Sequence, residues 1–164
     1  FAAVGAATTA DAEGNPTMDI LVSTKDSLGH WSTPTALPSP INTTSQDKAP
    51  FIHPDGRTLY FASNRQPGGG GFDLWFSQRD STGSWSTPKN FGAPVNTSGD
   101  EHGLVVTTDG ATAYFSSRRP GTQGLDILSF PVPKSLQPED VRLVKGTLLD
   151  KNGKPPSGAL PRPS

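Results

Sequence analysis

"DKAPFIHPDGRTLYFASNRQPGGGGFDLWFSQRDSTGSWSTPKNFGAPVN", the stretch from Asp47 to Asn96, recurs one period later and, in truncated form, one period earlier. Trp85 follows Trp31 by 54 positions (85 − 31 = 54), and Tyr114 follows Tyr60 by the same interval (114 − 60 = 54). A fixed period near fifty that is filled with short strands indicates a β-propeller or a related repeat array.

The composition favours an all-β fold. The chain of 164 residues contains 18 glycines and 17 prolines, and only 32% of its residues are hydrophobic. Turn-forming residues at this density, without helical periodicity, are typical of many short strands joined by tight turns. The formal net charge of −1 argues against nucleic acid as a partner. The absence of cysteine excludes disulfides, and no apolar run reaches the ~18 residues of a membrane-spanning helix.

The complete repeat predicts four antiparallel strands, at about residues 49–53, 58–62, 72–77 and 84–91. The Pro-Asp-Gly sequence at 54–56 predicts a tight turn between the first two, because proline presets φ and glycine accepts a positive φ. A glycine-rich loop at 64–71, which we expect to be mobile, joins the second strand to the third. Four antiparallel strands per period is the composition of a propeller blade.

The repeats divide the chain into a partial propeller at 1–130, with copies at about 1–45, 46–99 and 100–130. The first copy is degenerate at its start. The third copy ends before the fourth strand, which carries a tryptophan in the other two copies. A proline-bearing linker follows at 131–140, and the alternating pattern of 141–164 predicts the incomplete start of a second β domain. Because propellers close with about 4–8 blades, we expect an incomplete ring with exposed edges, from which blades and an outer strand are missing.

Repeated positions predict structural roles. These positions are Asp55, Gly56, Tyr60, Trp85, Asp109, Gly110, Tyr114 and Trp31. Most of the fifteen acidic residues also recur at matching positions. Because a catalytic residue breaks the symmetry of a repeat whereas a structural residue obeys it, we expect no catalytic residue in this chain.

Metal and cofactor sites are not expected either. The three histidines, His30, His53 and His102, fall at different repeat phases, which favours surface or turn positions over metal ligation. Acidic residues at 47, 100 and 101 offer oxygen ligands for Ca²⁺, but no EF-hand or nonapeptide spacing accompanies them. The Asn-x-Thr/Ser sequences at Asn42 and Asn96 are repeat-equivalent, and we interpret them as asparagine turns.

Two hairpins resemble the Asp-box of sialidase propellers. Asp26 precedes Trp31 by five positions (31 − 26 = 5), and Asp80 precedes Trp85 by the same interval (85 − 80 = 5), although the glycine is displaced by one place. An Asp-box is itself a folding turn. We therefore expect each tryptophan to cover the outer edge of its blade, with ligand stacking as the alternative.

The rim of the glycine-rich loop is the predicted partner-binding surface, because loops on a rigid scaffold carry most recognition. The predicted residues are Asn64, Arg65, Asp73, Arg118, Arg119 and Asp126. The alternative is that an Arg–Asp pair, with Asp73 or Asp126 closing the loop, serves only to hold the loop in place.

The succession "HPDGRTLYFASNR", "GGGGFDLWFS", "WSTPKNFGAPVNT" and "GLDILSF" resembles the TolB-like, WD-repeat-like propeller repeats of bacterial cell-envelope proteins. The order of propeller, linker and "VKGTLLDKNGKP" is similar to that of OmpA-family proteins, in which a carboxypeptidase-regulatory-like domain follows the propeller. His102 departs from the family pattern, which usually has an aromatic residue such as phenylalanine there.

The resemblance implies a non-enzymatic interaction or scaffold module of the bacterial cell envelope, in the periplasm or at the outer membrane. Envelope proteins or peptidoglycan-associated molecules are the implied partners, and no cofactor is implied. Because one propeller fold hosts many functions, an alternative stays open. That alternative is a sialidase-like or other glycan-active propeller whose catalytic residues lie in blades outside this sequence.

Overall fold

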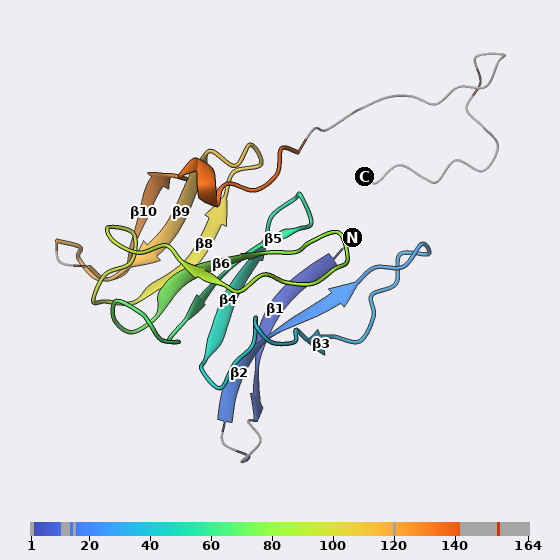
Figure 1. Cartoon of the computed structure of the whole chain (residues 1–164), viewed down its shortest axis with the longest axis horizontal. Coiled ribbons are helices and arrows are strands. Elements are labelled where there is room, and N and C mark those ends of the chain that lie inside the picture. Colours follow the sequence, from blue (N-terminus) through green and yellow to red (C-terminus); the bar gives the residue numbers. More distant parts are fainter. Residues whose placement is uncertain (1, 11–13, 15, 120, 142–153, 155–164) are drawn as a thin grey trace.

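The computed structural model describes residues 2–10, 14, 16–119, 121–141 and 154. Within these ranges the protein is all-β, with three antiparallel sheets, none of which closes on itself (Figure 1). No helix among them is long and apolar enough to cross a membrane. The predicted β domain at 141–164 lies almost wholly outside the described residues.

The three sheets follow one another along the chain. The first contains β1 (Ala2–Ala10), β2 (Pro16–Thr24) and β3 (Thr35–Ala36) in the order β1-β2-β3. The central sheet contains β4 (Asp47–Ile52), β5 (Thr58–Ser63), β6 (Asp73–Gln78) and β7 (Lys89–Asn90) in chain order. The third contains β8 (Glu101–Val106), β9 (Thr112–Ser117) and β10 (Asp126–Pro131).

The period read from the sequence is reproduced in the strands. β4 and β8 begin 54 positions apart (101 − 47 = 54), and so do β5 and β9 (112 − 58 = 54). The bulges in the first strands of these two sheets also match, because the pairing register shifts between Lys48 and Phe51 in β4 and between His102 and Val105 in β8. The strands of the central and third sheets therefore follow the same 54-residue period.

The fourth strand of the complete repeat is shorter than predicted. Of residues 84–91, only Lys89–Asn90 form a strand, and Trp85 makes an isolated bridge to Arg79. Between them the Ser86 side chain accepts a hydrogen bond from the Gln78 N–H at 3.1 Å, in place of a backbone carbonyl. Pro88 lacks an N–H group, so the regular ladder cannot continue through it.

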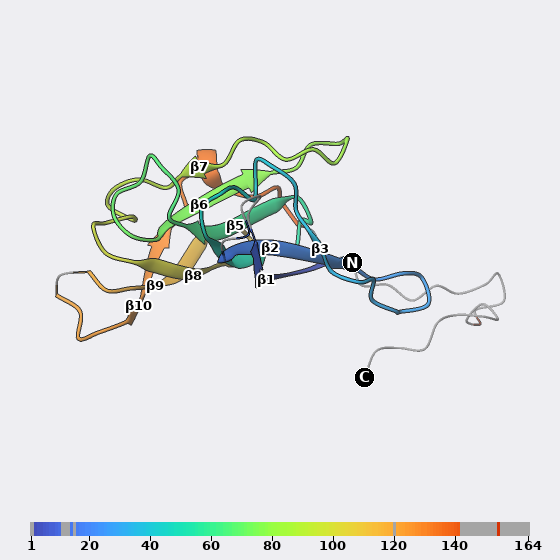
Figure 2. The ribbon, with the colours of Figure 1, turned by 90° about the horizontal axis from the view of Figure 1, so that it is seen from below.

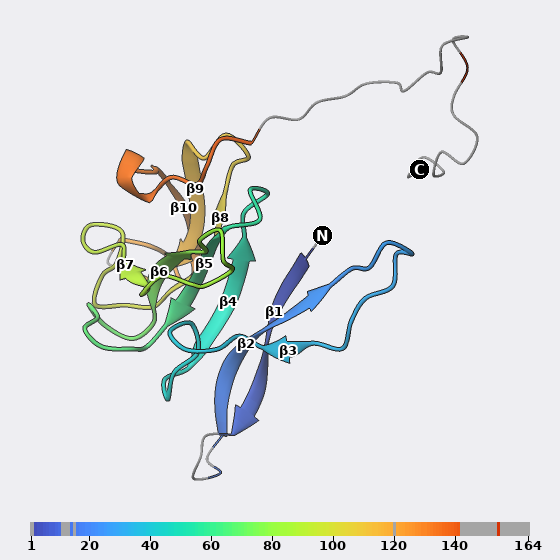
Figure 3. The same cartoon turned by 45° about the vertical axis from the view of Figure 1, so that its right-hand side comes forward.

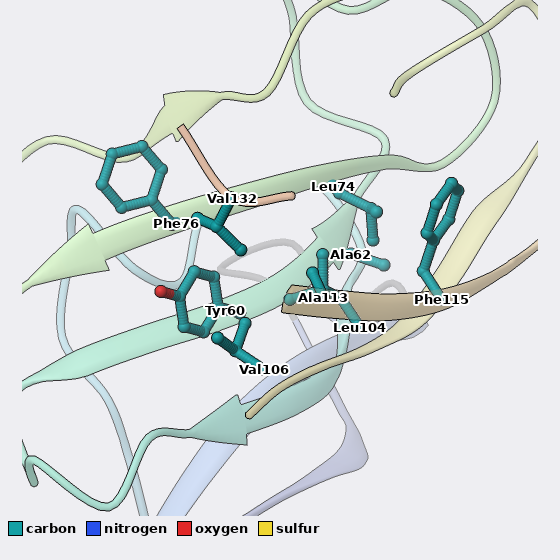
Figure 4. Packing of buried hydrophobic residues seen from close by; sticks show 9 residues of the cluster. All are labelled: Tyr60, Ala62, Leu74, Phe76, Leu104, Val106, Ala113, Phe115 and Val132. Atoms are coloured by element: carbon teal, nitrogen blue, oxygen red, sulfur yellow. The ribbon is translucent and has the colours of Figure 1, made fainter. Parts of the chain in front are cut away.

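Two hydrophobic clusters cover the two faces of the central sheet, since successive side chains of a strand point to opposite faces. Toward the first sheet, Leu59, Phe61 and Trp75 pack with Ile20 and Ile41. Residues of the central sheet whose side chains point to the opposite face pack against the third sheet. This cluster consists of Tyr60, Ala62, Leu74, Phe76, Leu104, Val106, Ala113, Phe115 and Val132 (Figure 4). The central sheet therefore lies between the other two (Figure 3).

Antiparallel pairing places the connections at two opposite ends of the sheets. The hairpin face carries the turns near 53–57 and 107–111 and the hairpins tipped by 26–30 and 80–84. The loop face carries loops 38–46, 64–72 and 92–100, together with Arg118, Arg119 and 121–125. Figure 2 shows the loop face on its left side and the hairpin tips on its right.

The linker folds back onto the hairpin face. A single 3₁₀ turn, η1 (Lys134–Leu136), follows β10, and Val132 is buried beside it. The Tyr60 hydroxyl donates a hydrogen bond to the Leu136 carbonyl at 3.2 Å, and Arg57 pairs with Glu139 at 2.8 Å. The linker thus fastens the central sheet to the third sheet.

Candidate functional site on the loop face

Arg65 is the centre of a latch between the first and central sheets. Its guanidinium pairs with the buried carboxylate of Asp47 at 2.5 Å and donates to the carbonyls of Pro40, at 3.0 Å, and Ile41. The Ser63 hydroxyl accepts a further bond from Arg65 Nε at 3.0 Å. The Arg65 side chain is only 9% exposed, so its charged group holds loop 38–46 in place and does not face the solvent.

Arg119 makes the matching latch one period later. It donates to the carbonyls of Pro94, at 3.1 Å, and Val95, at 2.6 Å, and to the Ser117 hydroxyl at 3.2 Å. Its separation from Glu101 is longer, at 3.7 Å, and 23% of its side chain is exposed. This second latch is therefore looser and more accessible than the first.

The structure shows which carboxylates lie beside these arginines. Arg65 does form an Arg–Asp pair that holds a loop, but its partner is Asp47 rather than Asp73. Asp73 is buried and instead accepts bonds from the Gly69 N–H at 2.6 Å and the Asn90 amide at 3.1 Å. Its other oxygen, Oδ1, has no hydrogen-bond partner among the described residues.

The remaining predicted rim residues lie toward solvent. Asn64 is exposed and accepts a bond from the Gln46 N–H at 2.8 Å, and Asp126 is exposed and accepts one from the Gln123 N–H at 3.3 Å. Arg118 is exposed and, with Arg119 and Gly99, lines a hollow of about 460 Å³. The structure therefore gathers Arg118 and Arg119 at one open hollow and withdraws Arg65 and Asp73 into the interior.

The glycine-rich loop packs closely on the next repeat. A Cβ added to Gly70 would lie 2.4 Å from the backbone carbon of Ser98, and the Gly71 N–H donates to the Gly99 carbonyl at 3.3 Å. The Phe72 N–H donates to Asp100 Oδ1 at 2.9 Å. The sequence indicated a free connection here, but these glycines allow a backbone-to-backbone contact that no larger residue would permit.

A group of cationic and aromatic side chains lies where β4 and β8 begin, next to the loop face. Lys48 Nζ lies 3.3 Å from the ring centre of Phe72, and the His102 ring lies 5.3 Å from the same ring. Lys48 and His102 are repeat equivalents (102 − 48 = 54). His102 is half-buried on a strand, which corrects the expectation of a surface or turn histidine.

The charges of this group depend on one another. Burial lowers the pKa of His102, and the positive charge of Lys48 lowers it further, against the opposing effect of Asp100 and Glu101. Burial likewise lowers the pKa of the Lys48 ammonium, while Asp100 raises it. The group therefore favours a neutral imidazole beside a lysine whose charge is stabilised by an aromatic face and a carboxylate.

The other histidines differ from one another. His30 is exposed in a hairpin, as predicted, and lies 3.4 Å from Asp26. His53 does begin a turn, but it is buried rather than on the surface. Its Nε2 lies 3.1 Å from the Thr107 carbonyl of the third sheet, so it links two sheets.

The repeated aspartates organise turns. Asp55 accepts bonds from the N–H groups of Arg57, at 2.8 Å, and Thr58, at 2.9 Å, and Asp109 accepts one from Ala111 at 3.0 Å. Burial opposes ionisation of Asp55, but these bonds outweigh it and lower the pKa. The pKa of Asp109 is lowered mainly by the Thr107 hydroxyl. Gly56 and Gly110 complete the turns with φ of 68° and 71°.

The Asp-box-like hairpins are folding turns as well. Asp80 Oδ1 accepts bonds from Thr82 N–H at 2.8 Å and Ser84 N–H at 3.0 Å. The pKa of Asp80 is lowered chiefly by the Thr82 hydroxyl. Trp85 packs on the cluster between the first and central sheets, with Arg79 over its ring at 5.5 Å. Trp31 is 47% exposed and has Lys25 over its ring at 5.7 Å.

The two asparagines bond to the backbone of a neighbouring strand. Asn96 accepts a bond from the Leu74 N–H at 2.8 Å and donates to the Leu74 carbonyl at 3.0 Å. Asn42 bonds Ile20 in the same way, at 2.8 Å and 3.0 Å. Each side chain therefore bonds the backbone of the third strand of its own repeat, 22 positions away in the sequence, rather than making the local asparagine turn that we expected.

No cluster of three or more His, Cys, Asp or Glu side chains that could hold a metal ion occurs in the part of the chain that the structure describes. The fold and the site together define a class: an all-β protein of stacked antiparallel sheets, whose repeated polar residues fix the connections between sheets. No protein-family model, curated protein or solved structure matches the chain.

Proposed function

We propose that this chain is a section of a β-propeller that serves as a non-enzymatic interaction module of the bacterial cell envelope. In this proposal the sheets are successive blades, with β4 and β8 as inner strands and β7 as an outer strand. The three sheets, of three, four and three strands, stack face to face in chain order, as the blades of a propeller do, and this arrangement supports the proposal. The resemblance to TolB-like repeats of OmpA-family proteins supports the envelope location.

The observation that carries the non-enzymatic role is that the repeated carboxylates are already used in the fold. Asp47 and Glu101 hold the two arginine latches and accept bonds from Thr43 and Thr97, respectively. A general acid or nucleophile needs a carboxylate that faces a substrate. These carboxylates face the interior, which favours a scaffold over a hydrolase.

The loop face is the surface that we assign to the partner. Its frame is constant from repeat to repeat, but side chains on it vary: exposed Arg118 replaces exposed Asn64 (118 − 64 = 54), and half-buried His102 replaces half-buried Lys48. A rigid frame with variable exposed side chains is typical of recognition surfaces. The cationic side chains of Arg118 and Lys48 favour a partner that carries carboxylates, such as an acidic envelope protein or the peptide stems of peptidoglycan.

The test is co-sedimentation of the chain with purified peptidoglycan and with immobilised envelope proteins. We expect Arg118→Glu to reduce the bound fraction severalfold. Lys134→Glu is the matched control, because it makes the same charge change at an exposed residue outside the loop face. Absence of enrichment on either material, or equal effects of the two variants, would contradict the proposal. Turnover of a glycoside panel by the chain would instead favour the glycan-active alternative.

A further inference from the structure

The two outer sheets each carry one face that the described residues leave open. On the third sheet the side chains of one phase protrude: Val105 is 45% exposed, Tyr114 is 44% exposed and Ile127 is 79% exposed. In the central sheet, the equivalents of the last two are Tyr60 and Leu74, which are 0% and 1% exposed. We call Val105, Tyr114 and Ile127 the knob face.

On the first sheet the open face is hollow. Its cavity of about 320 Å³ is lined by Gly5, Ala7 and Leu21, among others. The central sheet has Leu59, Phe61 and Trp75 at the equivalent positions, and there they fill the contact with the first sheet. Replacement of Leu59 by Gly5 and of Phe61 by Ala7 removes most of that volume. We call Gly5, Ala7 and Leu21 the hollow face.

The packing within the chain shows which face meets which. The side of the central sheet that carries Tyr60 and Leu74 packs on the side of the third sheet that carries Ala113 and Phe115 (Figure 4). The knob face of the third sheet is equivalent in the repeat to the side of the central sheet that carries Tyr60. The hollow face of the first sheet is equivalent to the side of the third sheet that carries Phe115. The two open faces therefore have the same relationship as the two faces already joined inside the molecule.

We infer that, for the 164-residue chain by itself, the knob face of one copy packs into the hollow face of a second copy, and that two copies close head to tail into one ring of six sheets. Large side chains on one face match missing volume on the other, and the side chains named for both faces are uncharged. A head-to-tail interface produces a closed ring where the rotation per copy divides a full turn, and six lies within the range of about 4–8 blades. This inference rests on the propeller fold of the proposed function, but it uses neither the loop face nor its partner, so a failed dimer test and a failed binding test can be told apart.

The first test is the oligomeric state of the 164-residue chain by sedimentation velocity and light scattering. We expect a concentration-dependent species of twice 17.2 kDa. Ile127→Glu and Ala7→Glu should each weaken the dimer at least about tenfold, because each places a charge in an apolar contact. Leu28→Glu is the control, because Leu28 is 80% exposed on a hairpin tip outside both faces. Far-UV circular dichroism checks that every variant keeps its fold.

The second test fixes the geometry. The native chain has no cysteine, so the double variant Ala7→Cys/Ile127→Cys carries one thiol on each face. When a short bismaleimide cross-links the two thiols, a closed ring gives a covalent dimer and no cross-linked species larger than a dimer. Three results would each overturn the inference. The first is a chain that stays monomeric at 100 micromolar, about ten times a ~10 micromolar Kd, which corresponds to a free energy near −7 kcal/mol. The others are equal behaviour of Ile127→Glu and Leu28→Glu, and a ladder of longer cross-linked chains.

Discussion

Arg65 and Arg119 occupy the same position in successive repeats and bind the same set of groups. Each donates to two adjacent carbonyls of the preceding connection and to the serine two residues before itself, and each faces a carboxylate. The two latches differ in burial and in the length of the ion pair. They therefore form a natural pair for measuring how much such a latch contributes.

Arg65→Met should lower the free energy of unfolding by about 3–5 kcal/mol, because it leaves the buried Asp47 carboxylate without its cation. Arg119→Met should cost less, about 1–2 kcal/mol, since its contacts are chiefly hydrogen bonds at a partly exposed site. Urea unfolding followed by tryptophan fluorescence measures both. Arg118→Met, at the exposed neighbouring position, is the control and should change stability little. Equal values for the Arg65 and Arg118 variants would exclude the latch.

Gly70→Ala should destabilise the protein by roughly 1–3 kcal/mol, because the added Cβ overlaps the Ser98 backbone and one of the two loops must move. Gly5→Ala is the matched control, since nothing lies within 4 Å of a Cβ added there, and both variants are compared at a protein concentration at which the chain is monomeric, because Gly5 belongs to the hollow face. The urea midpoint of each variant gives the comparison. If the Gly70 variant were as stable as the Gly5 variant, the contact between loops 64–72 and 92–100 would not exist in solution.

The strands and turns could be predicted from the sequence, because their causes are local. Alternating apolar residues and Pro-Asp-Gly turns act over a few positions, and the period then carries the assignment from one copy to the next. Asp55 and Asp109 both accept hydrogen bonds in turns of this kind. The resulting stack of sheets is the part of the expected fold that the structure shows.

The partners of the latches could not be predicted in this way. Asp47 and Asp73 both lie within reach of Arg65 in sequence, and only the fold decides which carboxylate is buried beside it. The return of the linker also depends on a distant contact, between the Tyr60 hydroxyl and the Leu136 carbonyl. Proline-rich composition indicated a connection at 131–140, but composition alone does not show what a connection packs against.

Asp55→Asn should reduce the dependence of stability on acidic pH. The folded state lowers the pKa of Asp55 below its usual 3.8, so its contribution is fully present above 3.8 and is lost as the pH falls through the lowered value. The variant should therefore melt at a lower temperature than the native chain near neutral pH and lose less stability between pH 5 and about 2.5, a window that extends ~1–1.5 units to either side of the ordinary carboxyl pKa. Thermal melts across this range measure the effect. Asp140→Asn, in the exposed part of the linker, is the control, and an equal flattening in that variant would contradict the assignment.

His102 should make folding weaker in mild acid. Its pKa is lowered by burial and by Lys48, so the neutral form stabilises the fold above the ordinary value of 6.5, and this contribution is lost as the pH falls through the lowered pKa. His102→Phe should remove that part of the pH dependence, and Lys48→Met should raise the pKa of His102 by removing a neighbouring positive charge. Titration of the imidazole resonances by NMR measures the pKa directly. Lys25→Met, on the hairpin face, should leave it unchanged, and a Lys48 variant that behaved identically would show that the two side chains do not interact.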